Sequence, residues 1–123
     1  MSTEQIIEQK HLENAVDLLS QKGYQSIKAD LDNYDKPVAF SQKNSENTFV
    51  PDLTAVSRSG KCYFEIVTKD KKDQDEVISR WKLFSTLATM RNGKFVLLVT
   101  RGMMRFTMDT IQNHHIEADV MKL

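Results

Sequence analysis

The chain has 123 residues, and its 17 basic and 17 acidic residues cancel to a net charge of zero. This length predicts one domain, residues 1–123, with a core that needs no covalent staple. The zero net charge argues against a strongly basic nucleic-acid binder. The single cysteine, Cys62, excludes an internal disulfide and a cysteine-rich zinc site, so we expect a reducing, cytoplasmic setting. No apolar run reaches membrane-spanning length, and no membrane partner is expected.

The first third of the chain predicts a helix and then a strand. Gly23 follows an apolar stripe at helical spacing, in the position of a glycine that ends a helix. The stripe consists of Leu12, Ala15, Val16 and Leu19. Residues 24–31 mix β-forming and polar side chains and indicate a first strand. Residues 37–40 favour a short strand, and the polar residues 41–47 a loop.

A hairpin is predicted in the middle of the chain. Residues 48–57 have the composition of a strand, but Pro51 interrupts it, which implies an edge position or a bulge. The turn at residues 58–60 contains a glycine, and residues 61–68 form the next strand. The two strands should therefore lie side by side.

The second half predicts alternating helices and strands. Residues 73–90 carry a helical stripe, and residues 95–99 are a continuous apolar run typical of a strand covered on both faces. The stripe consists of Val77, Trp81, Phe84 and Ala88. Gly102 leads into a shorter helix, and residues 116–123 form either a last strand or a tail. The shorter helix should place on one side Met104, Met108 and Ile111. The predicted order is α-β-β-β-α-β-α, an α/β fold.

Glu65 stands in the middle of an apolar strand. Side chains alternate between the two faces of a strand, and both faces around Glu65 are largely apolar. Burying an ionised carboxylate without compensation costs several kcal/mol or more. A basic partner, a raised pKa, a cleft open to water or a metal ion must offset this cost.

Asp52 is the nearest acid on the neighbouring predicted strand, and it can face Glu65 across the hairpin. Two adjacent carboxylates repel each other, and a divalent cation between them removes that repulsion. Oxygen ligands suit Mg²⁺ or Mn²⁺, which activate water for attack on a phosphate. Two simpler interpretations stay open: Pro51-Asp52 is a common turn dipeptide, and Glu65 can pair with Lys61 or Lys69.

The whole pattern resembles the PD-(D/E)xK nucleases, and among them the archaeal Holliday-junction resolvases. The resemblance rests on a helix that ends in Gly-Tyr (residues 18–24), a Pro-Asp strand (residues 49–55) and a glycine turn before a glutamate strand (residues 60–69). The helix at residues 73–90 and the buried strand at residues 95–99 complete the family core. This resemblance covers roughly residues 5–105.

The resemblance implies a restriction-endonuclease-like mixed central sheet flanked by helices. It implies a DNA phosphodiesterase that depends on Mg²⁺ or Mn²⁺, with Asp52 and Glu65 as catalytic residues and metal ligands. The family often adds a glutamate from the first helix, which is Glu8 or Glu13 here; Glu8 lies on the apolar stripe. Family resolvases act as dimers, so a homodimer is the implied assembly.

One departure from the family affects catalysis directly. The family lysine stands two residues after the glutamate, and Val67 occupies that position. Lys69 is the predicted substitute, although it lies about 13 Å from Glu65 along an extended strand; Lys82 is another. The sequence therefore leaves two functions open. One is a metal-dependent nuclease with a degenerate site, and the other is an inactive nuclease fold that serves as a binding or assembly module.

Positive charge is concentrated in one part of the chain. Residues 58–101 contain ten basic and five acidic residues, whereas the rest of the chain has an acidic surplus. Such a segment favours contact with the phosphate backbone of DNA, although ordinary solvated charge explains it equally well. The predicted DNA contacts are Arg58, Lys71, Lys72 and Arg80.

Overall fold

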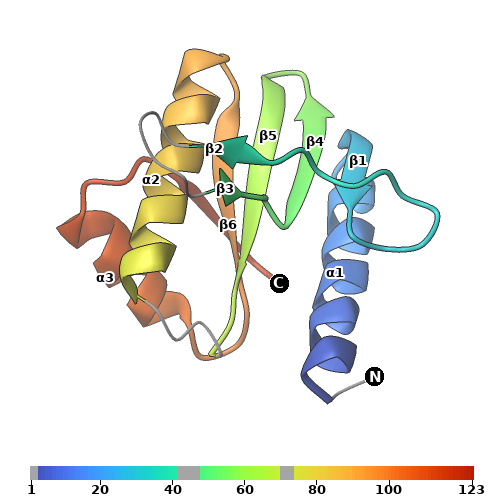
Figure 1. Ribbon diagram of the computed structural model, residues 1–123, viewed down its shortest axis with the longest axis horizontal. Coiled ribbons are helices and arrows are strands. Elements are labelled where there is room, and N and C mark those ends of the chain that lie inside the picture. Colours follow the sequence, from blue (N-terminus) through green and yellow to red (C-terminus); the bar gives the residue numbers. More distant parts are fainter. Residues whose placement is uncertain (1–2, 42–47, 70–73) are drawn as a thin grey trace.

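A five-stranded mixed β-sheet forms the centre of the molecule, and helices flank it (Figure 1). The structure is a computed structural model that describes residues 3–41, 48–69 and 74–123. The helices are α1 (Thr3–Gln21), α2 (Gln74–Met90) and α3 (Met104–Asn113). The strands are β1 (Gln25–Ala29), β2 (Phe40–Ser41), β3 (Thr48–Phe49), β4 (Leu53–Ser57), β5 (Gly60–Val67), β6 (Lys94–Val99) and β7 (Asp119–Lys122).

The sheet has the strand order β1-β4-β5-β6-β7. Strand β4 runs antiparallel to both of its neighbours, whereas β5, β6 and β7 are parallel to one another. The parallel strands are connected by α2 and α3, as parallel pairs require a crossover. The predicted hairpin is confirmed: β4 and β5 pair from Leu53↔Phe64 to Ser57↔Gly60 around a two-residue turn.

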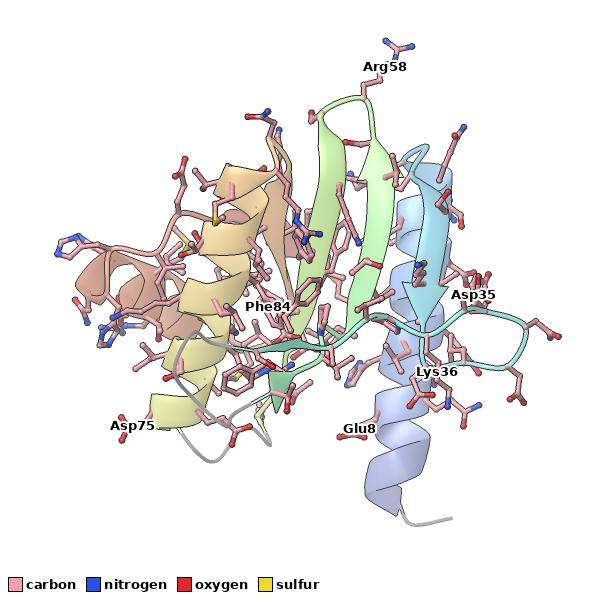
Figure 2. All side chains as sticks on the ribbon, turned by 45° about the horizontal axis from the view of Figure 1, so that its top comes forward. Glu8, Asp35, Lys36, Arg58, Asp75 and Phe84 are labelled. Carbon is pink, nitrogen blue, oxygen red and sulfur yellow. The ribbon has the colours of Figure 1, made fainter. Side chains whose placement is uncertain are left out.

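Two apolar clusters fill the space between the sheet and its helices. On one face, α1 contributes three fully or nearly buried side chains, as the stripe predicted: Ala15, Val16 and Leu19. On the other face, α2 contributes the four predicted residues of its stripe: Val77, Trp81, Phe84 and Ala88. Figure 2 shows Phe84 pointing from α2 toward the sheet. Because Tyr63 and Val67 belong to this second cluster, the α2 face is the face of β5 that also carries Glu65.

Pro51 divides the long strand that the sequence predicts over residues 48–57. The first piece, β3, pairs with β2 in a separate two-stranded sheet, while β4 joins the main sheet. Proline has no amide hydrogen and cannot continue a ladder, so the chain bends at Pro51 and Asp52. The interruption that Pro51 predicts is therefore confirmed, but it is a break between two sheets rather than a bulge, and β4 is an inner strand of the main sheet rather than an edge strand.

The end of α1 follows the predicted glycine. Gly23 adopts a φ of 87°, in the left-handed region that glycine reaches without a Cβ penalty. The amide of Gly23 donates to the carbonyl oxygen of Ser20, and the amide of Tyr24 donates to that of Leu19. These two bonds satisfy carbonyl groups that the helix leaves free.

The C-terminal part of the chain adds detail to one prediction and resolves another. On α3, Met104 and Ile111 are half-buried, whereas Met108 has an exposed fraction of 46%. Thr107 is buried, and burial costs it little because its hydroxyl donates to the carbonyl oxygen of Met103. Residues 119–122, within the segment predicted as either a strand or a tail, form strand β7. Among the described residues, no helix combines the length and apolar character needed to cross a bilayer.

Candidate functional site

The two predicted acids meet at the end of the hairpin that lies away from its turn. Leu53↔Phe64 is the last paired position of the ladder, and Asp52 and Glu65 are the next residues on the two strands. The backbone amide of Asp52 donates to Oε2 of Glu65 over 3.1 Å. The backbone amide of Ile66 in turn donates to Oδ2 of Asp52 over 2.8 Å. The carboxylate groups thus replace carbonyl acceptors where the regular ladder stops.

Arg80, on α2, supplies the positive charge that compensates the buried Glu65. The side chain of Glu65 is fully buried, and the Nε atom of Arg80 donates to its Oε1 over 2.7 Å. The Nη2 atom of Arg80 donates to the carbonyl oxygen of Val50 over 2.7 Å. The guanidinium also lies 5.5 Å from the ring centroids of Phe49 and Phe84. Arg80 is therefore fixed by hydrogen bonds and by aromatic packing.

The charge balance at this site favours a permanent cation on Arg80. Burial by itself lowers the pKa of the guanidinium, whereas the hydrogen bond and the charge of Glu65 raise it. Asp52 and Glu76 act in the same direction, and the resulting pKa lies above the usual arginine value. Of the four ways to offset the cost of burying Glu65, the structure therefore provides a basic partner.

The arrangement does not suit a metal ion bound directly at Glu65. Both carboxylate oxygens of Glu65 accept hydrogen bonds, and the guanidinium of Arg80 would repel a divalent cation there. In the part of the chain that the structure describes, no group of three or more His, Cys, Asp or Glu side chains is placed to hold a metal ion. The metal-binding role predicted for Asp52, Glu65 and Glu8 stays a prediction.

Asp52 instead opens onto a pocket that it shares with Glu8. The pocket has a volume of about 290 Å³ and lies against α1. Its lining also includes His11, Asp30, Pro37, Val50, Ile66 and Thr68. Figure 2 labels Glu8 on α1, where its side chain is exposed. The structure thus brings Glu8 and Asp52 to one cavity, whereas Glu65 is held on the α2 face of the sheet.

Position 67, where the PD-(D/E)xK nucleases have a lysine, is closed by packing in this chain. Val67 is fully buried in the cluster that contains Val77 and Trp81. Lys69 is exposed, and its Nζ lies 3.8 Å from where a Cβ on Gly102 would stand. Lys82 is exposed on α2. The catalytic role predicted for Lys69 stays a prediction.

The predicted DNA contacts are dispersed. Arg58 projects from the tip of the β4–β5 hairpin into solvent, as Figure 2 shows. Arg80 is held at Glu65, where its side chain is 17% exposed. Lys71 and Lys72 lie outside the described residues. The described cations of this set therefore occupy opposite ends of the hairpin.

The structural role of Arg80 is what sequence reasoning missed. Arg80 follows Val77 by three residues and precedes Phe84 by four, so it lies on the same side of the helix as the apolar stripe. The sequence did contain a signal for this role. A basic residue lies beside the buried stripe of a helix, and the same chain places an acidic residue in a buried strand. The competing expectation, a solvated arginine at a DNA surface, rested on charge alone.

Comparisons with known proteins give no relative from which a function can be carried over. No protein-family model matches the chain. No curated protein and no solved structure gives a significant match.

Proposed function

We propose that this chain is a PD-(D/E)xK-type domain that binds DNA without cutting it. The order of its elements supports the restriction-endonuclease-like fold: a helix, a strand, a Pro-Asp strand, a glycine turn and a glutamate strand precede a helix and a buried strand. The mixed sheet between helices agrees with the same fold. Because one fold serves many functions, the case for binding without cleavage rests on the site.

The ion pair between Arg80 and Glu65 is the observation that carries this proposal. A metal-dependent nuclease needs its carboxylates free to hold the ion and needs a cation near the reacting phosphate. Here the guanidinium neutralises Glu65 directly over 2.7 Å, and Val67 has no amine to offer. The acids then serve to end the β4–β5 ladder and to anchor α2 against it.

A second candidate function retains the metal, and the shared pocket of Glu8 and Asp52 favours it. In this alternative, the two carboxylates and water would hold Mg²⁺ or Mn²⁺ on the α1 side of the sheet, where oxygen ligands suit such an ion. The ion would supply a bound hydroxide for hydrolysis of a DNA phosphodiester. Lys69 remains the proposed lysine substitute in that case.

A titration with Mn²⁺ separates the two candidates. For the binding module, we expect no cleavage of duplex, single-stranded or four-way-junction DNA and a melting temperature that does not depend on Mn²⁺. A genuine site with a Kd one-hundredth of the Mn²⁺ concentration would add about 2.7 kcal/mol, a rise of roughly 10 °C. Thermal unfolding with and without Mn²⁺ and gel analysis of labelled DNA provide the two measurements.

Matched variants make the titration decisive. Asp52→Asn and Glu8→Gln each remove one carboxylate charge from the pocket with little change in shape. A Mn²⁺-dependent rise in melting temperature that both variants lose would establish the metal site, and DNA cleavage that both variants lose would refute the non-cutting module. Cleavage that persists unchanged in both variants would instead identify a contaminating nuclease.

A further inference from the structure

Three cations, Lys28, Lys61 and Arg91, lie around Tyr63 on one face of the β4–β5 hairpin. Lys28 pairs with Thr54, and Thr54 pairs with Tyr63, so these side chains share one face of the sheet. Lys61 stands two residues before Tyr63 and is therefore on the same face. The hairpin tip extends beyond the neighbouring strand β1 at the top of Figure 1. Val56, which pairs with Lys61, is 42% exposed, so this corner of the face is open to solvent.

Two of these cations are held in place by aromatic rings. The Nη1 atom of Arg91 donates to the hydroxyl of the buried Tyr63 over 3.2 Å. The guanidinium of Arg91 lies 5.5 Å from the ring centroid of Phe40, and the ammonium of Lys61 lies 5.7 Å from that of Tyr63. The two rings pack edge to face at 5.7 Å. The cations are thus ordered before any ligand arrives, which reduces the entropy lost on binding.

The same cations repel one another. Burial lowers the pKa of the Lys61 ammonium, and the positive charges of Arg91 and Lys28 lower it further. Within the described part of the chain, the ion pairs involve other cations, and none of them includes Lys28, Arg58, Lys61 or Arg91. A concentrated negative charge from outside would relieve this repulsion. The arrangement is therefore suited to a phosphate group.

We propose that Lys28, Lys61 and Arg91 form a phosphate-binding surface for the backbone of duplex DNA, with Arg58 extending it at the hairpin tip. The surface is open: Arg58 and Arg91 are exposed, and Lys28 and Lys61 are half-buried. An open, ordered cation surface suits a polymer of phosphates better than a small ligand that needs enclosure. The choice of DNA as the phosphate carrier rests on the proposed function, whereas the phosphate chemistry rests on the cations themselves.

Two double variants that remove the same charge test this surface. Lys61→Gln/Arg91→Gln removes two cations from it, and Lys10→Gln/Arg105→Gln removes two exposed cations elsewhere. The probe is a fluorescein-labelled 20-base-pair duplex, measured by fluorescence anisotropy at several salt concentrations. We expect the first variant to bind at least ten-fold more weakly and to reduce the salt slope by about two, because each lost phosphate contact contributes about one. The second variant should stay within about two-fold of the wild type.

The outcomes separate this inference from the proposed function. Binding by the wild type that both double variants weaken equally, or that neither weakens, refutes the surface and leaves the DNA-binding module standing. A wild type that does not bind the duplex refutes the module, and the surface with it. Lys61→Arg/Arg91→Lys keeps both charges, and its wild-type affinity would show that charge, rather than altered folding, explains the loss. Melting temperatures of all variants are measured in parallel.

Discussion

Replacing Arg80 by methionine is expected to lower the free energy of unfolding by about 3–5 kcal/mol, because removing one partner of a buried ion pair leaves the other charge uncompensated. Glu65 is fully buried, so water cannot replace the guanidinium at Oε1. The carbonyl oxygen of Val50 would lose a donor as well. Urea unfolding followed by circular dichroism measures the loss, which corresponds to a fall of roughly 10–20 °C in melting temperature.

Two further variants show whether the ion pair is the cause. Glu65→Gln/Arg80→Met removes both charges while an amide oxygen can still accept from the Asp52 amide, and we expect it to recover at least half of the loss. Arg105→Met removes a guanidinium whose side chain is 95% exposed and should leave the melting temperature almost unchanged. Equal effects of Arg80→Met and Arg105→Met would mean that Arg80 does not compensate Glu65. An Arg80→Met protein that Mn²⁺ stabilises, unlike the wild type, would show that the guanidinium occupies the place of a metal ion at Glu65, in agreement with the non-cutting module.

Gly93→Ala is expected to destabilise the protein by about 3 kcal/mol or more. A Cβ at Gly93 would stand 1.7 Å from the carbonyl oxygen of Lys61 and 2.8 Å from its carbonyl carbon. Neither atom belongs to a flexible side chain, so the turn after α2 must move away from β5. This contact precedes the first parallel pair, Cys62↔Lys94, and its loss would weaken the β5–β6 ladder from its start. Denaturant unfolding gives the magnitude.

Gly23→Ala is the matched control for Gly93→Ala. Gly23 has a φ of 87°, but no atom lies within 4 Å of the position that its Cβ would take. The cost there is conformational alone, about 1–2 kcal/mol. If the two substitutions cost the same, the close approach of Gly93 to Lys61 would not be what constrains that turn.

Much of the fold was predictable because long elements carry clear periodic patterns. The stripes of α1 and α2 and the continuous apolar run of β6 each predicted buried residues that the structure buries. The failures occur where local chemistry competes with the pattern. Pro51 signalled an interruption but not that β3 would leave the main sheet, since that depends on its pairing with the distant β2. On α3, Met108 fits the helical spacing of the apolar residues but is exposed. The neighbouring polar residue Thr107 is buried, and its hydroxyl donates a hydrogen bond within the helix.

The site was predictable only in part. Strand register shows which residues meet, but it does not show what surrounds their side chains. The meeting of Asp52 and Glu65 follows from a two-residue turn and antiparallel pairing. Their different surroundings depend on the bend at Pro51, which turns Asp52 toward the pocket, and on α2, which carries Arg80 to Glu65. No sequence spacing reports how a helix lies on a sheet. The cations around Tyr63 come from three separate parts of the chain and were invisible for the same reason.

Strand β5 is paired along both edges and covered on both faces, and this protects its amide groups from hydrogen exchange. Strand β5 has a bonded neighbour on each side and apolar clusters over both faces, so most of its amides should exchange only when the whole molecule unfolds. Ile66 differs, because its amide proton is held by the carboxylate of Asp52 rather than by a backbone carbonyl. Exchange at Ile66 that is faster than at Phe64 would report separate opening of the acidic end of the hairpin while the rest of the sheet stays closed.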